Sequence, residues 1–400
     1  MQMDKIYMRI LIFLSICCLP SSMLAQESQK ARIYKNGEVV AEIAFDSIAI
    51  NVRDTPTPPS TKGHTYVQVN NEVYCDGQKM TLRMPGSDDD YAVNRILYKD
   101  GSLYACRFHV EWTGGIYRYD VILWKDCEYL FSYELEEPFW TPTNFEIDGN
   151  DIYVYGMGTR ELADGSMYSL AFLTKNGTST STYYETTLYG FYSNQGTQYK
   201  IYPYEYYPTD HSTNMKLQKT TVIRLDINDE PMELQGRDGS KMHYVTDTKL
   251  HDGTPYVSGY TITYTTPANI CQGWIACSIT QYMQPEGITN IHSFDIDREG
   301  NYWAFCTQST ENGGSEYSII KNGVLQYDFP QFDIPENVLF SPENTKVSVA
   351  GNDIYVYGSM GGYDENGEYH LYGFLVKNGK AEWGPVMDKV INNIIYTSEE

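Results

Sequence analysis

The sequence predicts an all-β protein, a β-propeller of about six four-stranded blades preceded by a short hairpin segment. Of the 400 residues, 37 are tyrosine and 14% are aromatic, a composition that favours strands. A two-part unit of roughly 50 residues recurs along the chain, as expected for a repeat architecture. No helical spacing of apolar residues accompanies these units. Neighbouring sheets must therefore bury one another, which radial stacking achieves.

Residues 1–25 have the three parts of a secretory signal in order: basic residues, the apolar run 10–19, and small residues before Ala25. We predict cleavage after Ala25, with a lipoprotein signal at Cys17 or Cys18 as the alternative. No later stretch approaches the roughly 20 apolar residues of a membrane span. We therefore expect an exported protein, located in the periplasm, at the cell surface or outside the cell, with no transmembrane segment in the mature chain.

Residues 26–62 form a separate N-terminal segment in this interpretation. Asn36 and Gly37 lie between two strand-like runs, which is a strong hairpin signal. Residues 53–62 contain no apolar residue besides proline, so they cannot bury a face and are predicted to be a linker. The propeller is then expected over residues 63–400.

The first part of the repeated unit is a turn followed by an apolar strand, clearest at 148–156 and 350–358. Aligning the aromatic residue after each turn identifies six equivalent positions, 46 to 57 residues apart. We call these residues the anchors. They are Tyr104, Tyr153, Tyr199, Tyr256, Trp303 and Tyr355.

The second part is an apolar strand that ends in a basic turn. It occurs at 124–126, 174–177, 320–323 and 376–379, where the last three copies share Lys-Asn-Gly. Weaker copies are predicted at Val222–Leu225 and Trp274–Cys277. Because two independent features share one period, the repeat is unlikely to arise by chance. For ring closure, strands near 66–74 and 80–82 are expected to join the last blade beside 390–396.

These units resemble the secreted propeller-like repeat proteins of Bacteroidota-type bacteria. Such proteins carry an Asp-Val-Tyr-Val-Ala-Gly-like strand followed by a Tyr-Trp-Lys-Asn-Gly-like hairpin. The counterparts here are 151–156 with 175–177, and 353–358 with 377–379. That family has no assigned chemistry, so the resemblance implies a six-bladed fold and export but no activity.

No motif in the sequence identifies a catalytic, cofactor-binding or metal site. The seven histidines are scattered over different units, and neither His-x-His nor HExxH occurs. With 52 acidic residues, some carboxylate pair will always be found, so the glycosidase pattern is not specific. Cys75, Cys106, Cys127, Cys271, Cys277 and Cys306 form no CxxC pair, and we expect one or two disulfides among them.

The Tyr-rich stretch 199–208 contains Pro203 and Pro208, which argue against a central strand. Some of its tyrosines are therefore expected in irregular, exposed backbone. Exposed rings of this kind can stack on sugar faces.

The segment joining the two parts of each unit is long and variable, at 107–117, 157–168, 260–273, 307–317 and 359–369. Equivalent loops of a repeat emerge on one side, and variable loops on a rigid scaffold are frequent recognition sites. The predicted binding residues are Trp112, Arg160, Tyr260, Tyr264 and Tyr363.

From these features we expect a non-enzymatic, exported propeller that binds a protein or a glycan. The alternative is a propeller enzyme, a hydrolase or lyase acting on polysaccharide. A formal net charge of −23 disfavours nucleic acid as a partner, because neutralising phosphates requires basic patches.

Overall fold

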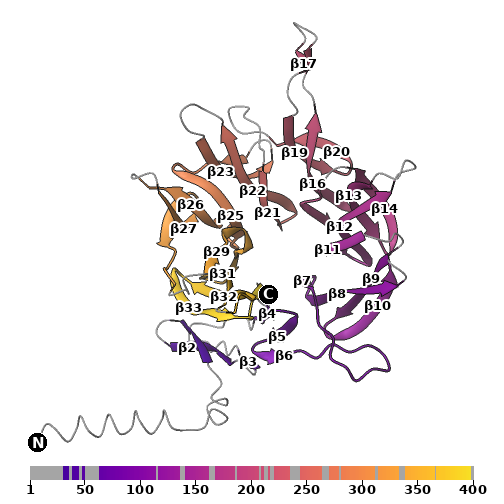
Figure 1. Ribbon diagram of the computed structural model, residues 1–400, viewed down its shortest axis with the longest axis horizontal. Coiled ribbons are helices and arrows are strands. Elements are labelled where there is room, and N and C mark those ends of the chain that lie inside the picture. Colours follow the sequence, from indigo (N-terminus) through magenta and orange to yellow (C-terminus); the bar gives the residue numbers. More distant parts are fainter. Residues whose placement is uncertain are drawn as a thin grey trace, which may run out of the picture.

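The computed structural model shows a ring of β-sheets (Figure 1). The described residues are 30–35, 38–44, 47–49, 63–113, 116–135, 140–161, 167–184, 187–206, 209–210, 215–216, 220–234, 244–263, 270–278, 281–310, 314–332, 338–364 and 366–397. The predicted signal at 1–25 and the linker at 53–62 lie outside these ranges. Within them, no helix has the length and apolar content needed to cross a bilayer.

Each of the six predicted units forms its own sheet of antiparallel strands, written here from the centre of the ring outward. Blade one is β7 (Arg95–Lys99), β8 (Ser102–Thr113), β9 (Ile116–Lys125) and β10 (Glu128–Glu134). Blade two is β11 (Trp140–Asp148), β12 (Asp151–Glu161), β13 (Met167–Lys175) and β14 (Thr178–Tyr184). Blade three is β15 (Gly190–Asn194), β16 (Thr197–Tyr206), β19 (Thr220–Ile227) and β20 (Glu230–Glu233), with a small β17 (Thr209–Asp210) and β18 (Met215–Lys216) extension.

The second half of the ring follows the same plan. Blade four is β21 (Tyr244–His251), β22 (Thr254–Thr263), β23 (Ile270–Ser278) and β24 (Gln281–Met283). Blade five is β25 (Ile288–Ile296), β26 (Tyr302–Ser309), β27 (Ser315–Lys321) and β28 (Val324–Asp328). Blade six has an inner strand in two pieces, β29 (Val338–Phe340) and β30 (Lys346–Ala350), separated by the 3-10 turn η1 (Pro342–Asn344), then β31 (Asp353–Tyr363), β32 (Tyr369–Lys377) and β33 (Lys380–Met387).

A seventh sheet closes the ring, so the predicted propeller is confirmed with seven blades in place of about six. Its inner strand is the C-terminal β34 (Ile391–Tyr396), followed by β4 (Thr65–Val69), β5 (Glu72–Cys75) and β6 (Gln78–Lys79). The expected pairing of the two chain ends is present, with Ile394 opposite Val67 and Tyr396 opposite Thr65. These strands form a separate blade because the sixth unit already has its own complete sheet.

The N-terminal segment forms a three-stranded sheet of β1 (Lys30–Lys35), β2 (Glu38–Ala44) and β3 (Ser47–Ala49). Strands β1 and β2 pair with Lys35 opposite Glu38, as the hairpin signal predicts. The turn residues Asn36 and Gly37 themselves lie outside the described residues.

The anchors occupy equivalent positions on the second strand of their blades. Tyr104, Tyr153, Trp303 and Tyr355 each lie opposite a lysine of the third strand. The four lysine ammonium groups lie 5.0 to 5.7 Å from the ring centroids, within cation–π range. Tyr66 is the seventh anchor, opposite Cys75 on the third strand of the closing blade.

The turn after the third strand holds each anchor strand in register. In blade six the Asn378 amide donates to the Ile354 carbonyl at 2.9 Å, and Asn378 Oδ1 accepts from the Ile354 amide at 2.9 Å. Asn378 has φ of 48°, a conformation that asparagine and aspartate adopt more readily than most residues. The same reciprocal pair forms in all six blades whose turn after the third strand lies within the described residues. The turn residues are Asp76, Asp126, Asn176, Asn228, Asn322 and Asn378.

A belt of hydrogen bonds involving side chains links every pair of neighbouring blades along the inner wall. From blade one to blade four, the bonds are Lys99 Nζ to Glu146 Oε1 at 2.6 Å, Ser193 Oγ to Asp148 Oδ2 at 2.7 Å and Tyr192 OH to Thr248 Oγ1 at 2.8 Å. From blade four to blade six, they are Ser293 Oγ to Asp247 Oδ2 at 2.6 Å and the Val349 amide to Asp295 Oδ2 at 2.9 Å. The closing blade is joined to blade six by the Ile394 amide to Tyr357 OH at 3.2 Å, and to blade one by Asn393 Nδ2 to the Ile96 carbonyl at 3.4 Å. We call this set the inner belt.

Charges in the inner belt are balanced across blades. Burial alone would raise the pKa of Asp247, but the ammonium groups of Lys346 and Lys249 and the Ser293 hydroxyl hold that pKa below its ordinary value. Lys346 Nζ lies 3.2 Å from Asp247 Oδ1. Burial raises the pKa of Glu146 even though Lys99 pairs with it. The belt therefore satisfies polar groups that would otherwise be costly to bury.

Two expectations about local structure are wrong. Pro203 lies within β16, not in irregular backbone, because β15 pairs only as far as Ile201 and requires no amide donor at position 203. All six cysteines of the described chain are free thiols, so the expected one or two disulfides do not form. Cys106 and Cys306, for example, are fully buried on the second strands of different blades.

Replacing Asp247 with alanine tests the inner belt. The change removes the acceptor of the fully buried Ser293 hydroxyl and leaves Lys346 without its partner. We expect the free energy of unfolding to fall by about 3 kcal/mol. This value is the lower end of the range for breaking a buried ion pair, because Lys346 is partly exposed. The matched control is Asp328→Ala on the exposed edge of β28, which should change stability by less than about 0.5 kcal/mol. Urea unfolding curves of equal midpoint for the two variants would contradict the role of the belt.

His292 makes stability depend on pH. Its ring is buried, Nε2 lies 2.7 Å from Thr307 Oγ1, and burial lowers its pKa from 6.5 to about 4. Between those values the unfolded chain binds a proton that the folded chain does not, so stability falls as pH decreases from 6.5 to 4. The loss should total roughly 3 kcal/mol.

Chemical unfolding at several pH values compares His292→Gln with the wild type. The variant should lose less stability than the wild type over this interval, whereas His251→Gln, at a partly exposed position, should keep the wild-type slope. Equal slopes for wild type and His292→Gln would show that His292 is not the group responsible.

Candidate functional site

The topology gives the ring two chemically different faces. In each blade, the start of the inner strand and the connection between the second and third strands lie on the same side of the ring. We call this side the hairpin face. The opposite side, the turn face, carries the short turns at Asn176, Asn322 and Asn378 and their equivalents. The prediction that equivalent connections gather on one face therefore agrees with the strand order.

The connections predicted as long loops are mostly extended strand. β8 and β9 pair along their whole length to Thr113 and Ile116, beyond the end of inner strand β7, which pairs only up to Cys106. β31 and β32 likewise pair to Tyr363 and Tyr369. The variable sequence is thus held in projecting hairpins, because paired strands continue past the inner strand and satisfy each other's backbone groups.

The five predicted binding residues differ in where they lie and in how much of each side chain is exposed. Trp112 on β8 and Tyr363 on β31 lie near hairpin tips, with 59% and 58% of their surface exposed. Tyr260 on β22 is half-buried. Arg160 is a residue of β12, opposite Tyr168; its side chain, like the whole of Tyr264, lies outside the described residues.

Among the side chains whose burial the structure describes, the exposed aromatic ones lie on the hairpin face. All six lie at a hairpin tip, on the projecting part of a second strand or at the start of an inner strand. They are Trp112, Tyr189, Tyr204, Tyr244, Tyr363 and Tyr369. The turn face instead presents aliphatic side chains such as Val324 and Leu325 beside the β27–β28 turn.

Blades three and four bring three tyrosines together, and we call them the tyrosine cluster. Tyr244 starts inner strand β21 and lies opposite Tyr260 of β22, with ring centroids 4.7 Å apart and planes inclined by 13°. Tyr189 immediately precedes inner strand β15 of the next blade. Burial raises the pKa of Tyr189, and the hydroxyls of Tyr244 and Tyr260 raise it further.

Two glycines allow this close arrangement. A Cβ on Gly190, next to Tyr189, would lie 2.5 Å from Thr248 Oγ1 of the neighbouring inner strand. A Cβ on Gly259 would lie 1.8 Å from the Tyr244 carbonyl oxygen. Larger residues would force the two blades, or the two strands, apart and separate the rings.

Tyr204 extends the aromatic surface on blade three. The guanidinium carbon of Arg224 lies 3.4 Å above the Tyr204 ring centroid, a close cation–π contact. Tyr204 retains 37% exposure. Blades three and four therefore present four tyrosines on the hairpin face, one of them backed by an arginine.

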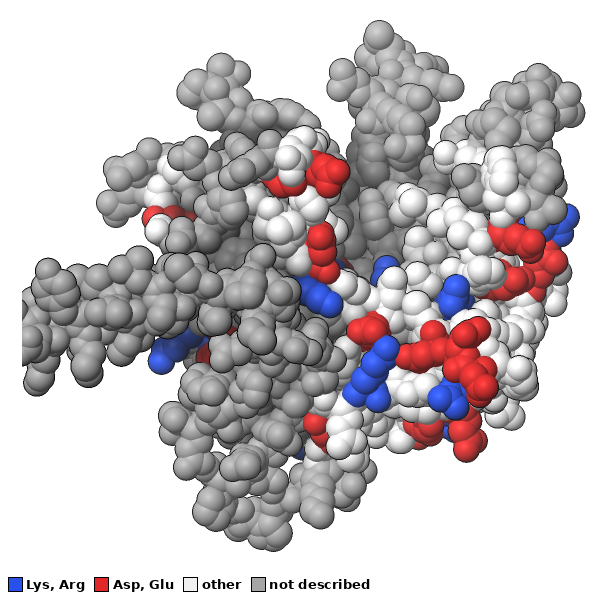
Figure 2. All heavy atoms as spheres, turned by 60° about the horizontal axis from the view of Figure 1, so that its bottom comes forward, with Lys and Arg blue, Asp and Glu red and all other residues white. Residues whose placement is uncertain are grey.

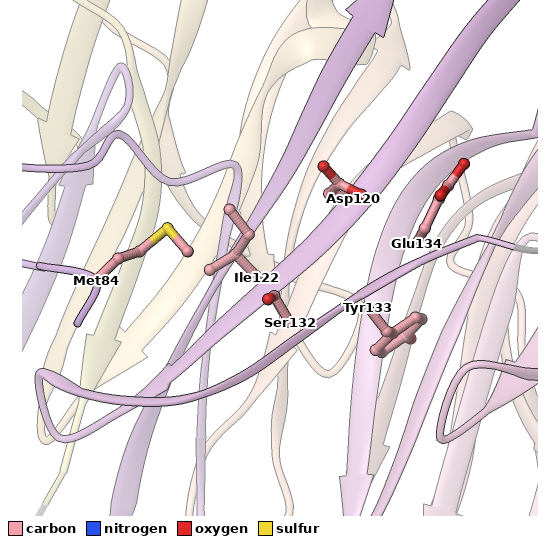
Figure 3. Close-up of a pocket in the computed structure, with 6 residues that line it drawn as sticks. All are labelled: Met84, Asp120, Ile122, Ser132, Tyr133 and Glu134. Atoms are coloured by element: carbon pink, nitrogen blue, oxygen red, sulfur yellow. The ribbon is translucent and has the colours of Figure 1, made fainter. Parts of the chain in front are cut away.

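A separate polar pocket of about 290 Å³ lies on the outer part of blade one (Figure 3). Asp120 of β9 and Glu134 of β10 are opposite each other in register, and Figure 3 shows both carboxylates on the same side of the sheet. Burial raises the pKa of Asp120, whereas Glu134 forms an ion pair with Arg118. The remaining lining residues are Met84, Ile122, Ser132 and Tyr133.

Two groups of side chains have the donors to hold a metal ion. His64, Cys75 and Asp76 lie where the chain ends meet, and Asp364, Glu368 and His370 lie at the tip of the β31–β32 hairpin. In each group the donor atoms lie within 4.8 Å of one another. We expected no metal site because the histidines are scattered along the sequence. Neither of the two groups has the residue spacing of a known metal motif.

The surface is acidic in keeping with the net charge of −23. Figure 2 shows one face on which Asp and Glu side chains gather on the right-hand side, with some Lys and Arg side chains between them. Ion pairs of the described residues include Lys79 with Glu72 and Lys79 with Asp90.

No protein-family model matches the chain, and no curated protein matches it. Among solved structures, the polysaccharide lyase Uly1 is 10% identical with a TM-score of 0.39 and covers 85% of this chain and 100% of its own. Xylan beta-1,4-xylosidase from Bacillus halodurans C-125 is 10% identical with a TM-score of 0.24, over 75% of this chain and 83% of its own.

Proposed function

We propose that this protein is an exported β-propeller that binds a glycan on its hairpin face, through the tyrosine cluster of blades three and four. The observation that carries the proposal is the confinement of exposed aromatic side chains to one face, where Tyr244, Tyr260 and Tyr189 converge. The export part of the proposal rests on the signal-like segment at 1–25.

Tyrosine suits a sugar ligand because its flat ring covers an apolar sugar face while its hydroxyl bonds to sugar hydroxyls. In the cluster, Tyr244 is 40% exposed and Tyr189 is 37% exposed, so both retain surface for a ligand. A rigid aromatic side chain also loses little conformational entropy on binding. The cluster is therefore preorganised by the two blades that carry it.

The charge of the chain indicates which glycans to expect. At −23, the protein repels polyanions at long range, and the tyrosine cluster is accompanied by one arginine, Arg224, which already lies against Tyr204. A neutral polysaccharide fits this surface better than a densely charged one.

Alanine replacement of both Tyr244 and Tyr260 tests this function. Mobility in native gels that contain xylan, dextran or pectin measures binding of the mature chain. We expect retardation by a neutral polymer, and a loss of affinity of tenfold or more in the double variant, which corresponds to about 1.4 kcal/mol. Tyr129→Ala, on the outer strand β10 away from the hairpin face, is the control and should bind as the wild type does.

Circular dichroism and an unchanged unfolding midpoint would show that the double variant is folded. Retardation equal to that of the wild type in a folded double variant would refute binding at the tyrosine cluster. Retardation by pectin alone would refute the preference for neutral polymers.

The pocket of blade one supports a second candidate function, hydrolysis of a polysaccharide. Glycosidases use two carboxyl groups whose environments separate their pKa values, one as acid and the other as base or nucleophile. Burial raises the pKa of Asp120, and Glu134 forms an ion pair with Arg118. In this candidate Asp120 is the acid and Glu134 is the second carboxyl group.

A reducing-sugar assay on xylan distinguishes this candidate from binding alone. If the pocket is catalytic, Asp120→Asn and Glu134→Gln should each reduce turnover by at least a hundredfold, whereas Glu128→Gln, exposed on the same strand β10, should leave it unchanged. Absence of turnover in the wild type, or equal turnover in all variants, would exclude the pocket as a catalytic site for this polymer.

A further inference from the structure

The tip of the β31–β32 hairpin on blade six carries a group of side chains that the proposed function does not use. Asp364 directly follows β31, and His370 is the second residue of β32, opposite Gly362. Glu368 lies between them in the connecting turn. One donor atom from each of these three side chains lies within 4.8 Å of the others.

The Asp364 carboxylate is held in place by the turn. Its Oδ1 accepts hydrogen bonds from the backbone amides of Asn366 at 2.9 Å and Glu368 at 2.8 Å. Its Oδ2 accepts from Asn366 Nδ2 at 3.1 Å and also faces His370. One oxygen thus fixes the turn, and the other points toward the imidazole.

The two nitrogens of His370 face different carboxylates. Nδ1 lies 3.2 and 3.3 Å from the two oxygens of Asp388, at the end of β33. Nε2 lies 3.6 Å from Asp364 Oδ2, which is too long for a good hydrogen bond. Asp388 therefore orients the ring and leaves Nε2 available on the side of Asp364 and Glu368.

This arrangement has the geometry of a metal ligand set. Two ligands on a tetrahedral zinc ion, each about 2.1 Å from the metal, are about 3.4 Å apart, close to the separation of His370 Nε2 and Asp364 Oδ2. A metal-binding histidine also typically donates its other ring N–H to a carboxylate, which is the position of Asp388.

We propose that Asp364, Glu368 and His370 bind a divalent transition-metal ion of the zinc class, with Asp388 as the outer partner that orients His370. One imidazole and two carboxylates supply three ligands and leave a fourth position for water or an external group. The site lies on the hairpin face beside Tyr363 and Tyr369, whose rings are 5.3 Å apart. The proposal does not depend on glycan binding at blades three and four.

The second group of possible ligands, His64, Cys75 and Asp76, differs in its internal bonding. Asp76 Oδ2 lies 2.6 Å from His64 Nδ1, and Asp76 Oδ1 accepts the Thr65 amide at 2.9 Å. A short hydrogen bond therefore already occupies the His64 nitrogen that faces this group, whereas His370 Nε2 lies 3.6 Å from Asp364. This group is the internal control.

Equilibrium dialysis of the metal-stripped mature chain against Zn²⁺, with metal analysis of the protein, tests the site. We expect one zinc ion bound per chain in the wild type and in His64→Ala, and no bound zinc in His370→Ala. Asp388→Asn should retain the zinc ion but bind it 10- to 100-fold more weakly, as loss of an outer partner does. Ca²⁺ at equal concentration should not displace Zn²⁺, because an imidazole ligand disfavours the harder cation.

The unfolding midpoint of each metal-free variant establishes that it is folded. The proposal is overturned if the wild type binds no Zn²⁺, if folded His370→Ala binds as much as the wild type, or if the zinc ion is lost in His64→Ala instead. Displacement by equimolar Ca²⁺ would also overturn it, since the site would then be a simple acidic one.

Discussion

The inner belt is the interaction on which the rest of this structure depends. Seven sheets stacked radially bury their faces against each other, and polar side chains such as Glu146 and Ser293 are buried where the inner strands converge. The belt satisfies these groups between blades: Lys99 reaches Glu146, Ser193 reaches Asp148, and Ser293 reaches Asp247. Because each bond joins a blade to its neighbour, the belt links the blades into one ring, in which every inner strand runs in the same direction.

The two faces of the ring follow from that common direction. On the turn face, reciprocal asparagine or aspartate bonds hold short turns that differ little between blades. On the hairpin face, the second and third strands continue past the inner strand and carry the variable residues. The exposed aromatic side chains, the tyrosine cluster and the group of Asp364, Glu368 and His370 all occur on the hairpin face. The face whose sequence varies most between blades is thus the face on which we propose recognition.

Repetition made most of the fold predictable from the sequence. The Lys-Asn-Gly turns and the anchors recur because a left-handed residue follows the third strand in most blades, and four blades place a lysine opposite the ring on the second strand. The seventh anchor, Tyr66, was missed because it precedes Tyr104 by a shorter interval than the others and its inner strand comes from the other end of the chain. Pro203 was misread because sequence does not reveal how far β15 pairs along β16.

The site was less predictable, since it depends on neighbours in space. Trp112, Tyr260 and Tyr363 were identified from their place in variable segments, whereas Tyr189 and Tyr244 start inner strands and have no such signal. Tyr244 meets Tyr260 within blade four, whereas the position of Tyr189 depends on the contact between blades three and four that Gly190 permits. His370 and Asp388 are likewise brought together by the pairing of β32 with β33, which no motif spacing encodes.

Closure of the ring by the C-terminal strand is the central claim of this account, and amide hydrogen exchange measures it directly. β34 pairs with β4 and its Ile394 amide donates to Tyr357 of blade six. The amides of 391–396 should therefore exchange as slowly as those of inner strands β7 and β11, and they should do so in one cooperative unit with β4. Exchange of 391–396 as fast as that of the exposed turn at 366–367 would contradict a closed seven-bladed ring.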